Sequence, residues 1–416
     1  MVNKFLKIAV AAVLSLVPST NVLAVPADEE KKWLKDLEAY STNLEASHID
    51  LFHKVSRMQL RASLNELKSK LAELTEPEIV AALMHITHGI GDGHTAMPLW
   101  NAGYHRFPVR LRLVGGKAII TAASPANRSM LGATITHWDG TEIGTAFERL
   151  APYVPFAENK FSTMVRAAAY MPVAELSHAI GLSKSPQSIK LRLEKNGVPE
   201  EVVLVAVNSG EYRSSLTEKI DYRRDLSNAE GLVEAEGLRF ALIEDESIGY
   251  IQFDRYPQAR EMRNFMGRVR RALERTGTEN LVIDFRENFG GDFFVGLLLA
   301  SNLITLDSLD WRNGIYVLTS GTTFSAAMSN SAQFADILNA RLVGTPTGAN
   351  PCGYQDMGQF ELPNSGHIIT YSKRYYCFAR AEADALLPDV QIDMQHQDFV
   401  EKRDRALDWI INDIKK

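Results

Sequence analysis

The sequence predicts an α/β protein built from more than one domain. Residues 238–387 alternate short apolar strands with helices, an order typical of a mostly parallel sheet covered by helices. Residues 26–90 instead carry apolar side chains at helical spacing, and residues 104–207 contain alternating strand patterns separated by turns. A chain of 416 residues can form two or three domains, each with its own core.

The first 24 residues have the pattern of an export signal. Lys4 and Lys7 precede the short apolar segment 8–17, and small residues at 22–24 suit cleavage. That apolar segment is too short to span a membrane, and no cysteine follows it to carry a lipid. We therefore expect residues 1–24 to be removed, leaving no membrane span and a periplasmic or secreted location in a bacterium. The alternative is an uncleaved anchor.

Composition narrows the choice of partners. The chain has 45 basic and 51 acidic residues, a net charge of −6, and no basic cluster interleaved with aromatic residues. This balance argues against nucleic acid as a partner. The hydrophobic share of 45% is that of an ordinary globular protein. Composition does not indicate an oligomeric state.

The chain divides into three expected domains after the signal. Residues 26–95 form a helical domain, in which Thr75 caps a helix that ends before the glycines at 89–93. Residues 104–210 form a mixed insert domain, with strands at 107–113, 117–122 and 133–137, helices at 144–150 and 163–180, and a strand pair around the turn 196–197. Residues 238–416 form the α/β core and a C-terminal helix.

The core elements follow one another in strand and helix order. Strands are expected at 240–242, 248–253, 281–285 and 315–318, and helices at 260–275, 291–304, 325–338 and 398–416. This succession predicts helices packed on a parallel sheet.

Ser325 lies where the strand 315–318 gives way to a helix. A serine at such a turn sits at the positive end of the helix, beside backbone N–H groups that have no partner within the helix. A nucleophile and the donors that stabilise an oxyanion can be built together there. The ordinary alternative is that Ser325 only caps the helix.

Two further segments carry groups that such a serine would need. The sequence 284–292 ends a buried strand in polar residues, and Gly290 and Gly291 offer unhindered N–H groups to an anion. His94 lies in the glycine-flanked segment 91–95, and a histidine can take up the serine proton. The alternatives are a simple glycine turn and a surface histidine.

An acidic segment near the end of the core supplies candidates to orient the histidine. Glu382 or Asp384 could hold the imidazole, as a carboxylate does in a catalytic triad. The alternative is a solvated acidic loop.

The two cysteines, Cys352 and Cys377, flank an expected hairpin at 355–372. In an oxidising compartment an even number of cysteines favours a disulfide, and two separate thiols are the alternative. With no histidine cluster beside the cysteines, no metal site is expected.

Taken in order, these motifs resemble a group of serine peptidases that includes the carboxy-terminal processing proteases and the tricorn protease core. The segments that carry the resemblance are Gly-Asp-Gly-His-Thr (91–95), Asp-x-Arg-x-Asn-x-Gly-Gly (284–291), Thr-x-Ser-Ala-Ala (323–327), Gly-Thr-Pro-Thr-Gly (344–348), Leu-Pro-Asn-Ser-Gly (362–366) and Leu-Pro-Asp (387–389). The resemblance implies a ClpP/crotonase-like α/β core, with a PDZ-like peptide-binding domain in the place of the insert.

The resemblance also implies roles for the site residues. Ser325 would be the nucleophile, and the N–H of Ala326 with that of Gly290 or Gly291 would form the oxyanion hole. The chain has no lysine between Lys219 and Lys373, so the lysine-using subgroup does not fit.

The tricorn-like subgroup instead uses a histidine, matched by His94, that is held by a glutamate, matched by Glu382. Gly93 departs from that pattern, because it stands where a relay serine is expected. Without the relay serine, His94 could contact Glu382 directly, or it could be oriented by Asp92 or by water.

The resulting hypothesis is a secreted or periplasmic serine endopeptidase that acts on peptides or proteins and needs no cofactor. A catalytically inactive peptide-binding protein is the alternative, favoured by Gly93 and by the acidic residues Glu287 and Asp292 beside the expected oxyanion loop. A crotonase-like acyl-thioester enzyme is a third possibility, which the export signal argues against.

Overall fold

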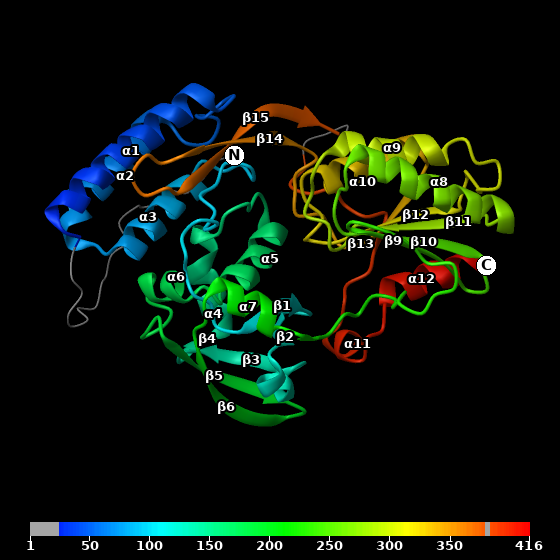
Figure 1. Ribbon diagram of the computed structural model, residues 1–416, viewed down its shortest axis with the longest axis horizontal. Coiled ribbons are helices and arrows are strands. Elements are labelled where there is room, and N and C mark those ends of the chain that lie inside the picture. Colours follow the sequence, from blue (N-terminus) through cyan, green and yellow to red (C-terminus); the bar gives the residue numbers. More distant parts are fainter. Residues whose placement is uncertain (1–24, 379–382) are drawn as a thin grey trace, which may run out of the picture.

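The computed structural model describes residues 25–378 and 383–416, which form a mixed α/β protein with several sheets. Figure 1 shows the N-terminal helices, an insert built on one sheet, and a core built on a second sheet, with a long β-hairpin running from the core to the N-terminal helices. In the described part of the chain, no helix is long and apolar enough to cross a membrane.

The N-terminal part is helical, as the sequence predicts, and the structure shows three α-helices there. Their bounds are α1 (Ala27–Ser47), α2 (Arg57–Lys70) and α3 (Glu76–His88). Thr75 begins α3 through a capping box with Glu78. Apolar side chains on facing sides of the helices, such as Leu37, Leu64 and Leu83, are fully or almost fully buried together.

The insert is built on a seven-stranded sheet with the central order β1-β2-β3-β5-β6. Its strands are β1 (Val109–Val114), β2 (Lys117–Ala123), β3 (Thr134–Trp138), β4 (Thr141–Glu142), β5 (Ser188–Lys195), β6 (Val198–Val205) and β7 (Glu218–Lys219), and its helices are α4 (Ile143–Leu150), α5 (Lys160–Tyr170), α6 (Ala174–Ala179) and α7 (Ser209–Ser215). Neighbouring strands all pair antiparallel.

The helix expected at 163–180 is wrong as a single element. The chain leaves the helical path after α5, where Pro172 offers its carbonyl to the N–H of Phe107. A new helix, α6, begins two residues later. A proline cannot continue the helical hydrogen-bond ladder, and here its carbonyl is satisfied by a segment far away in the sequence.

The core sheet has the order β16-β13-β12-β11-β10-β9-β8. Its strands are β8 (Val233–Ala235), β9 (Leu238–Ile243), β10 (Ile248–Phe253), β11 (Asn280–Asp284), β12 (Ile315–Thr319), β13 (Arg341–Gly344) and β16 (Val390–Gln391). The strands from β10 to β16 run parallel, whereas β8 and β9 are antiparallel additions at one edge. The prediction of a mostly parallel sheet is therefore confirmed.

Helices cover both faces of this sheet, because alternate strand residues are apolar on both sides. The helices α8 (Ala259–Thr276), α9 (Phe293–Leu303) and α10 (Ala326–Ile337) lie on one face, and α12 (Arg405–Ile414) lies on the other (Figure 1). Ile283 of β11 packs on the face covered by α8, α9 and α10. Its neighbour Val282 packs on the opposite face, in the same cluster as Leu407 of α12. The single C-terminal helix expected at 398–416 is wrong, since α11 (His396–Val400) ends at a turn before α12.

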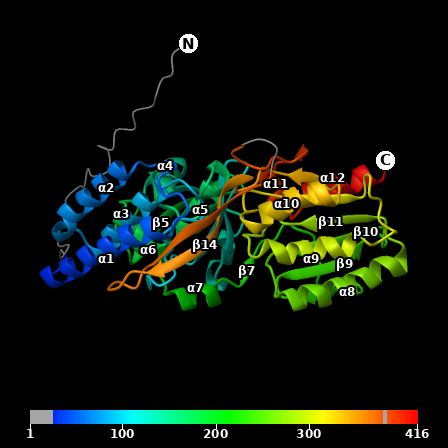
Figure 2. The same ribbon diagram turned by 90° about the horizontal axis from the view of Figure 1, so that it is seen from above.

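A hairpin of β14 (Cys352–Glu361) and β15 (Ile368–Cys377) leaves the core and reaches across to the N-terminal helices (Figures 1 and 2). Cys352 and Cys377 pair at its base and form a disulfide. Near its tip, Asn364 and Ser365 donate backbone N–H groups to the buried carboxylate of Asp36 on α1. The hairpin thus joins parts of the molecule that lie far apart in the sequence.

Candidate active site

Ser325 stands at the N-terminus of α10, after the loop that follows β12. Its backbone has φ 50° and ψ −126°, a conformation that side chains other than glycine rarely adopt. The residue occupies the capping position, but its side chain makes no capping hydrogen bond. The backbone turn instead presents the hydroxyl to His94.

His94 lies opposite the serine, with 2.8 Å between its Nε2 and the Oγ of Ser325. The histidine is almost fully buried, and its ring stacks on Phe324 with 5.2 Å between the ring centroids. Burial lowers its pKa below 6.5, against the opposing influence of Asp92 and of the Tyr354 backbone. The ring is therefore neutral near pH 7 and able to accept the serine proton.

The other ring nitrogen of His94, Nδ1, is buried and has no side-chain partner among the described residues, although the backbone of Tyr354 interacts with the ring and raises its pKa. Glu382, the expected orienting carboxylate, lies outside the described residues. Asp384 is exposed, and the contact it makes is through its backbone carbonyl, to the Asn159 side chain. The assignment of Glu382 as the partner of Nδ1 therefore stays a prediction.

Asp92 holds the loop that carries His94. Its Oδ1 accepts hydrogen bonds from the backbone N–H groups of His94 (3.0 Å) and Thr95 (2.8 Å) and from the hydroxyl of Ser372 (2.6 Å). Its Oδ2 accepts a bond from Nε2 of His48 at 2.9 Å. Burial alone would raise the pKa of Asp92, but the bonds from His48 and Ser372 outweigh it and lower the pKa to about 2.

Asp92 thus fixes the backbone of the histidine loop, and the ring nitrogen is left to another group. Asp92 therefore acts on His94 through the backbone of the loop, not through a contact with the imidazole ring. Neither His48 nor Ser372 was expected at the site, because neither stands in a motif. Their positions, 44 and 280 residues from Asp92, come together only when helix α1 and the hairpin pack beside the loop.

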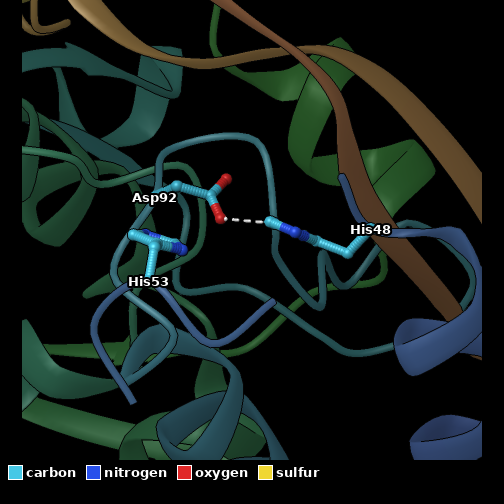
Figure 3. Close-up of side chains that lie close together, drawn as sticks. All are labelled: His48, His53 and Asp92. Carbon is cyan, nitrogen blue, oxygen red and sulfur yellow. Dashed lines mark hydrogen bonds and ion pairs between the residues drawn. The ribbon is translucent and has the colours of Figure 1, made fainter. Parts of the chain in front are cut away.

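His48, His53 and Asp92 converge closely enough to raise the question of a metal site (Figure 3). Nδ1 of His48 accepts the N–H of Asp50, so the proton of the neutral ring lies on Nε2, which donates to Asp92. A metal bound to Nε2 of His48 would force the ring proton onto Nδ1, where it would face the N–H of Asp50 and break that hydrogen bond. His53 has a free lone pair on Nε2, but with Asp92 it supplies only two ligands. These hydrogen bonds favour a structural His48–Asp92 pair over a metal site.

Of the two candidate glycines, Gly290 lies directly against Ser325. A side chain on Gly290, which has φ 108°, would place Cβ 2.7 Å from Cβ of Ser325 and 3.2 Å from N of Ala326. The N–H of Gly290 donates to the Asn288 side chain, so it is occupied. The N–H groups of Gly291 and Ala326 have no hydrogen-bond partner within the described part of the chain. Of the two glycines, Gly291 therefore has the free donor.

The two acidic residues beside this loop are already engaged. Glu287 binds Arg112 and accepts a bond from Tyr222, and Asp292 caps α9 through the N–H of Phe294. Because each carboxylate has partners of its own, neither is left as an isolated charge facing an oxyanion.

Glu158 is a further ionisable group at the site that has no sequence motif. A side chain on Gly93 would meet its Cβ at 3.0 Å, and its carboxylate accepts the N–H of Asn350. Burial raises the pKa of Glu158 to about 8, with Asp92 adding to the rise and the bond from Asn350 opposing it. A neutral Glu158 at pH 7 keeps a second negative charge away from Asp92.

Solved structures share this architecture. No protein-family profile matches the sequence, and no curated protein is significantly similar to it. A mutant of CPAF has 12% identity and a TM-score of 0.66, over 92% of this chain and 96% of CPAF. Mature CPAF in complex with lactacystin has 13% identity and a TM-score of 0.63, over 93% and 98% of the two chains. The tricorn protease gives a TM-score of only 0.43, too low to carry an argument. This chain therefore shares, over nearly its whole length, the fold of CPAF.

Proposed function

We propose that the protein is a serine endopeptidase that cleaves peptides or proteins through an acyl-enzyme. The observation that carries the proposal is the 2.8 Å contact between Nε2 of the buried His94 and Oγ of the strained Ser325. A hydroxyl nucleophile and a neutral base in hydrogen-bond contact are what acyl transfer requires.

In the proposed reaction, His94 takes the proton of Ser325 while Oγ attacks the peptide carbonyl. The N–H groups of Ala326 and Gly291 stabilise the negative oxygen of the tetrahedral intermediate, where removing one donor typically costs on the order of 3 kcal/mol. The imidazolium then protonates the leaving amine, and water hydrolyses the acyl-enzyme by the reverse proton path. Glu382 is the proposed partner of Nδ1.

The insert is proposed to act as the PDZ-like peptide-binding domain of a protein whose core is ClpP/crotonase-like. The strand β1 ends the order of its sheet, which is the position where an added strand would pair. Residues 1–24 would direct the protein to the periplasm or outside the cell, and lie outside the described residues. The fold that this chain shares with CPAF over nearly its whole length supports this division into an insert and a core.

A fluorophosphonate probe tests the nucleophile directly. We expect the wild-type protein to be labelled on Ser325, identified by peptide mass spectrometry, and Ser325→Ala to be unlabelled. His94→Ala should react about two to four orders of magnitude more slowly, because the general base is lost. Ser301→Ala, which alters an exposed serine on α9, is the matched control and should label like the wild type. Labelling that survives Ser325→Ala would refute the assignment.

One observation favours a second candidate, a catalytically silent peptide-binding protein. No carboxylate holds Nδ1 of His94 among the described residues, and a histidine base without an orienting carboxylate is a poorer catalyst. Absence of labelling and of peptide hydrolysis in the wild type, with peptide binding retained, would support this alternative.

A further inference from the structure

A large groove runs between the insert and the core. It has a volume of about 1350 Å³, larger than the pockets that usually hold small molecules, and a size suited to an extended peptide. Residues of β1 and α5 line the groove from the insert, and core residues line it as far as Thr322, three residues before Ser325. A peptide lying in this groove would therefore be led toward the candidate nucleophile.

The charges that line the groove are unbalanced once internal ion pairs are removed. Arg112, Arg223, Arg286 and Arg405 are each paired with a carboxylate. Within the part of the chain that the structure describes, five further cations of the lining have no carboxylate partner: Arg106, Arg110, Lys160, Lys219 and Arg255. Of the lining carboxylates, Asp393 alone has no cationic partner among the described residues.

Two of these cations lie in one row across the sheet. Arg110 of β1 pairs with Ala122 of β2, and Ala122 pairs on its other side with Lys219 of β7. Residues that face each other across antiparallel strands point to the same face, so Arg110 and Lys219 share one face at two strand spacings, about 10 Å. Both side chains are exposed, and both line the groove.

The remaining cations extend this pattern along the groove. Lys160 begins α5 close to the loop before Ser325, and Arg255 is exposed on the core side. A protein with a net charge of −6 thus places five cations that have no carboxylate partner among the described residues along one groove. Such a local excess attracts and orients a ligand of opposite charge.

We propose that this groove selects acidic peptide segments, bound in extended form along β1, for cleavage at Ser325. The inference deepens the proposed function and depends on it for the cleavage step alone. In an added strand, alternate side chains face the same way, so carboxylates at every second position would meet the row of Arg110 and Lys219.

Binding to the Ser325→Ala protein tests the groove without requiring catalysis. The probes are fluorescein-labelled peptides of about eight residues that alternate valine with glutamate, glutamine or lysine. Fluorescence anisotropy should show the glutamate peptide binding about tenfold more tightly than the glutamine peptide, with the lysine peptide weakest. The difference should shrink as salt is raised, because exposed charges are screened.

Charge-reversal variants locate the selectivity. In the Ser325→Ala background, the pair Arg110→Glu and Lys219→Glu should lose the preference for glutamate, whereas binding of the lysine peptide should improve. The pair Arg263→Glu and Arg312→Glu makes the same change of net charge on exposed core residues outside the groove lining. That control pair should keep the preference.

The outcomes separate this inference from the proposed function. Equal binding of the three peptides, or loss of the preference in the control pair as well, would overturn the groove inference even if the wild type hydrolyses peptides. Selective binding without any labelling or hydrolysis of the wild type would leave the groove inference standing and refute the peptidase.

Discussion

At the scale of single residues, the site depends on a base kept neutral by burial. Ser325 is held in a backbone conformation that costs on the order of 1–3 kcal/mol, which the packing of α10 and Gly290 must offset. His94 faces it with a pKa lowered by burial. These two properties together make proton transfer from the serine possible at neutral pH.

The pH dependence of peptide hydrolysis checks the state of His94. We expect kcat/KM to be level near neutrality and to fall on an acid limb below pH 6.5, because protonation of the buried ring is disfavoured. The folded pKa lies below the unfolded one, so the stability linked to the neutral ring is present above pH 6.5 and lost as pH falls. An acid limb with an apparent pKa above 6.5 would contradict this expectation and indicate a carboxylate beside Nδ1. If that carboxylate is Glu382, the variant Glu382→Gln should move the acid limb back below pH 6.5.

Asp92 is expected to act as a positioning residue. Asp92→Asn replaces one carboxylate oxygen by an amide that opposes the N–H of His48, so the loop of His94 should shift. We expect kcat to fall about tenfold to a hundredfold with little change in KM. His48→Gln, which can still donate to Asp92, should retain more activity than His48→Ala. Equal losses in these two variants would argue against the hydrogen bond as the cause.

At the scale of elements, the β14–β15 hairpin is the part that links the core to the helices. Its base is closed by the disulfide of Cys352 and Cys377, 25 residues apart. The hairpin touches the histidine loop directly, since Thr370 donates its hydroxyl to the carbonyl of His94 and Ser372 donates to Asp92. The stability of this one element therefore bears on the position of the base.

Removing the disulfide should destabilise the protein. Cys352→Ser combined with Cys377→Ser is expected to lower the free energy of unfolding by about 3 kcal/mol, as expected for a loop of this length. Thermal unfolding with and without reductant measures the effect. The wild type should respond to reductant and the double variant should not; a wild type indifferent to reductant would contradict the prediction.

At the scale of the whole molecule, the site is assembled from parts that belong to different regions. His94 follows the N-terminal helices, and Ser325 lies on the core. The hairpin spans these regions, and at its tip the buried Asp36 of α1 accepts bonds from the backbone of Asn364 and Ser365. A change at this distant contact should therefore reach the active site.

Asp36→Ala tests that connection. Loss of a buried acceptor leaves several N–H donors unsatisfied, so the free energy of unfolding should fall by about 1–3 kcal/mol. We also expect kcat to fall, because the hairpin no longer fixes the histidine loop. Glu29→Ala on the same helix, which removes a partly exposed carboxylate paired with Lys32, should change neither quantity appreciably. An unchanged kcat in Asp36→Ala would show that the base is positioned without the hairpin tip.

The sequence by itself determined the alternation of strands and helices from β9 to α10, but not the strands β8, β13 and β16, and it singled out Ser325 and His94. Those signals are local: apolar periodicity, a strand-to-helix turn, and a histidine between glycines. Only the tertiary structure decided that Asp92 holds the histidine loop with His48 and Ser372, and that Gly290 has its N–H occupied while Gly291 does not. It also decided that five cations without carboxylate partners among the described residues line one groove. The reason is physical: hydrogen-bond partners and ion pairs join residues far apart in the sequence, and no local pattern records which of them will meet.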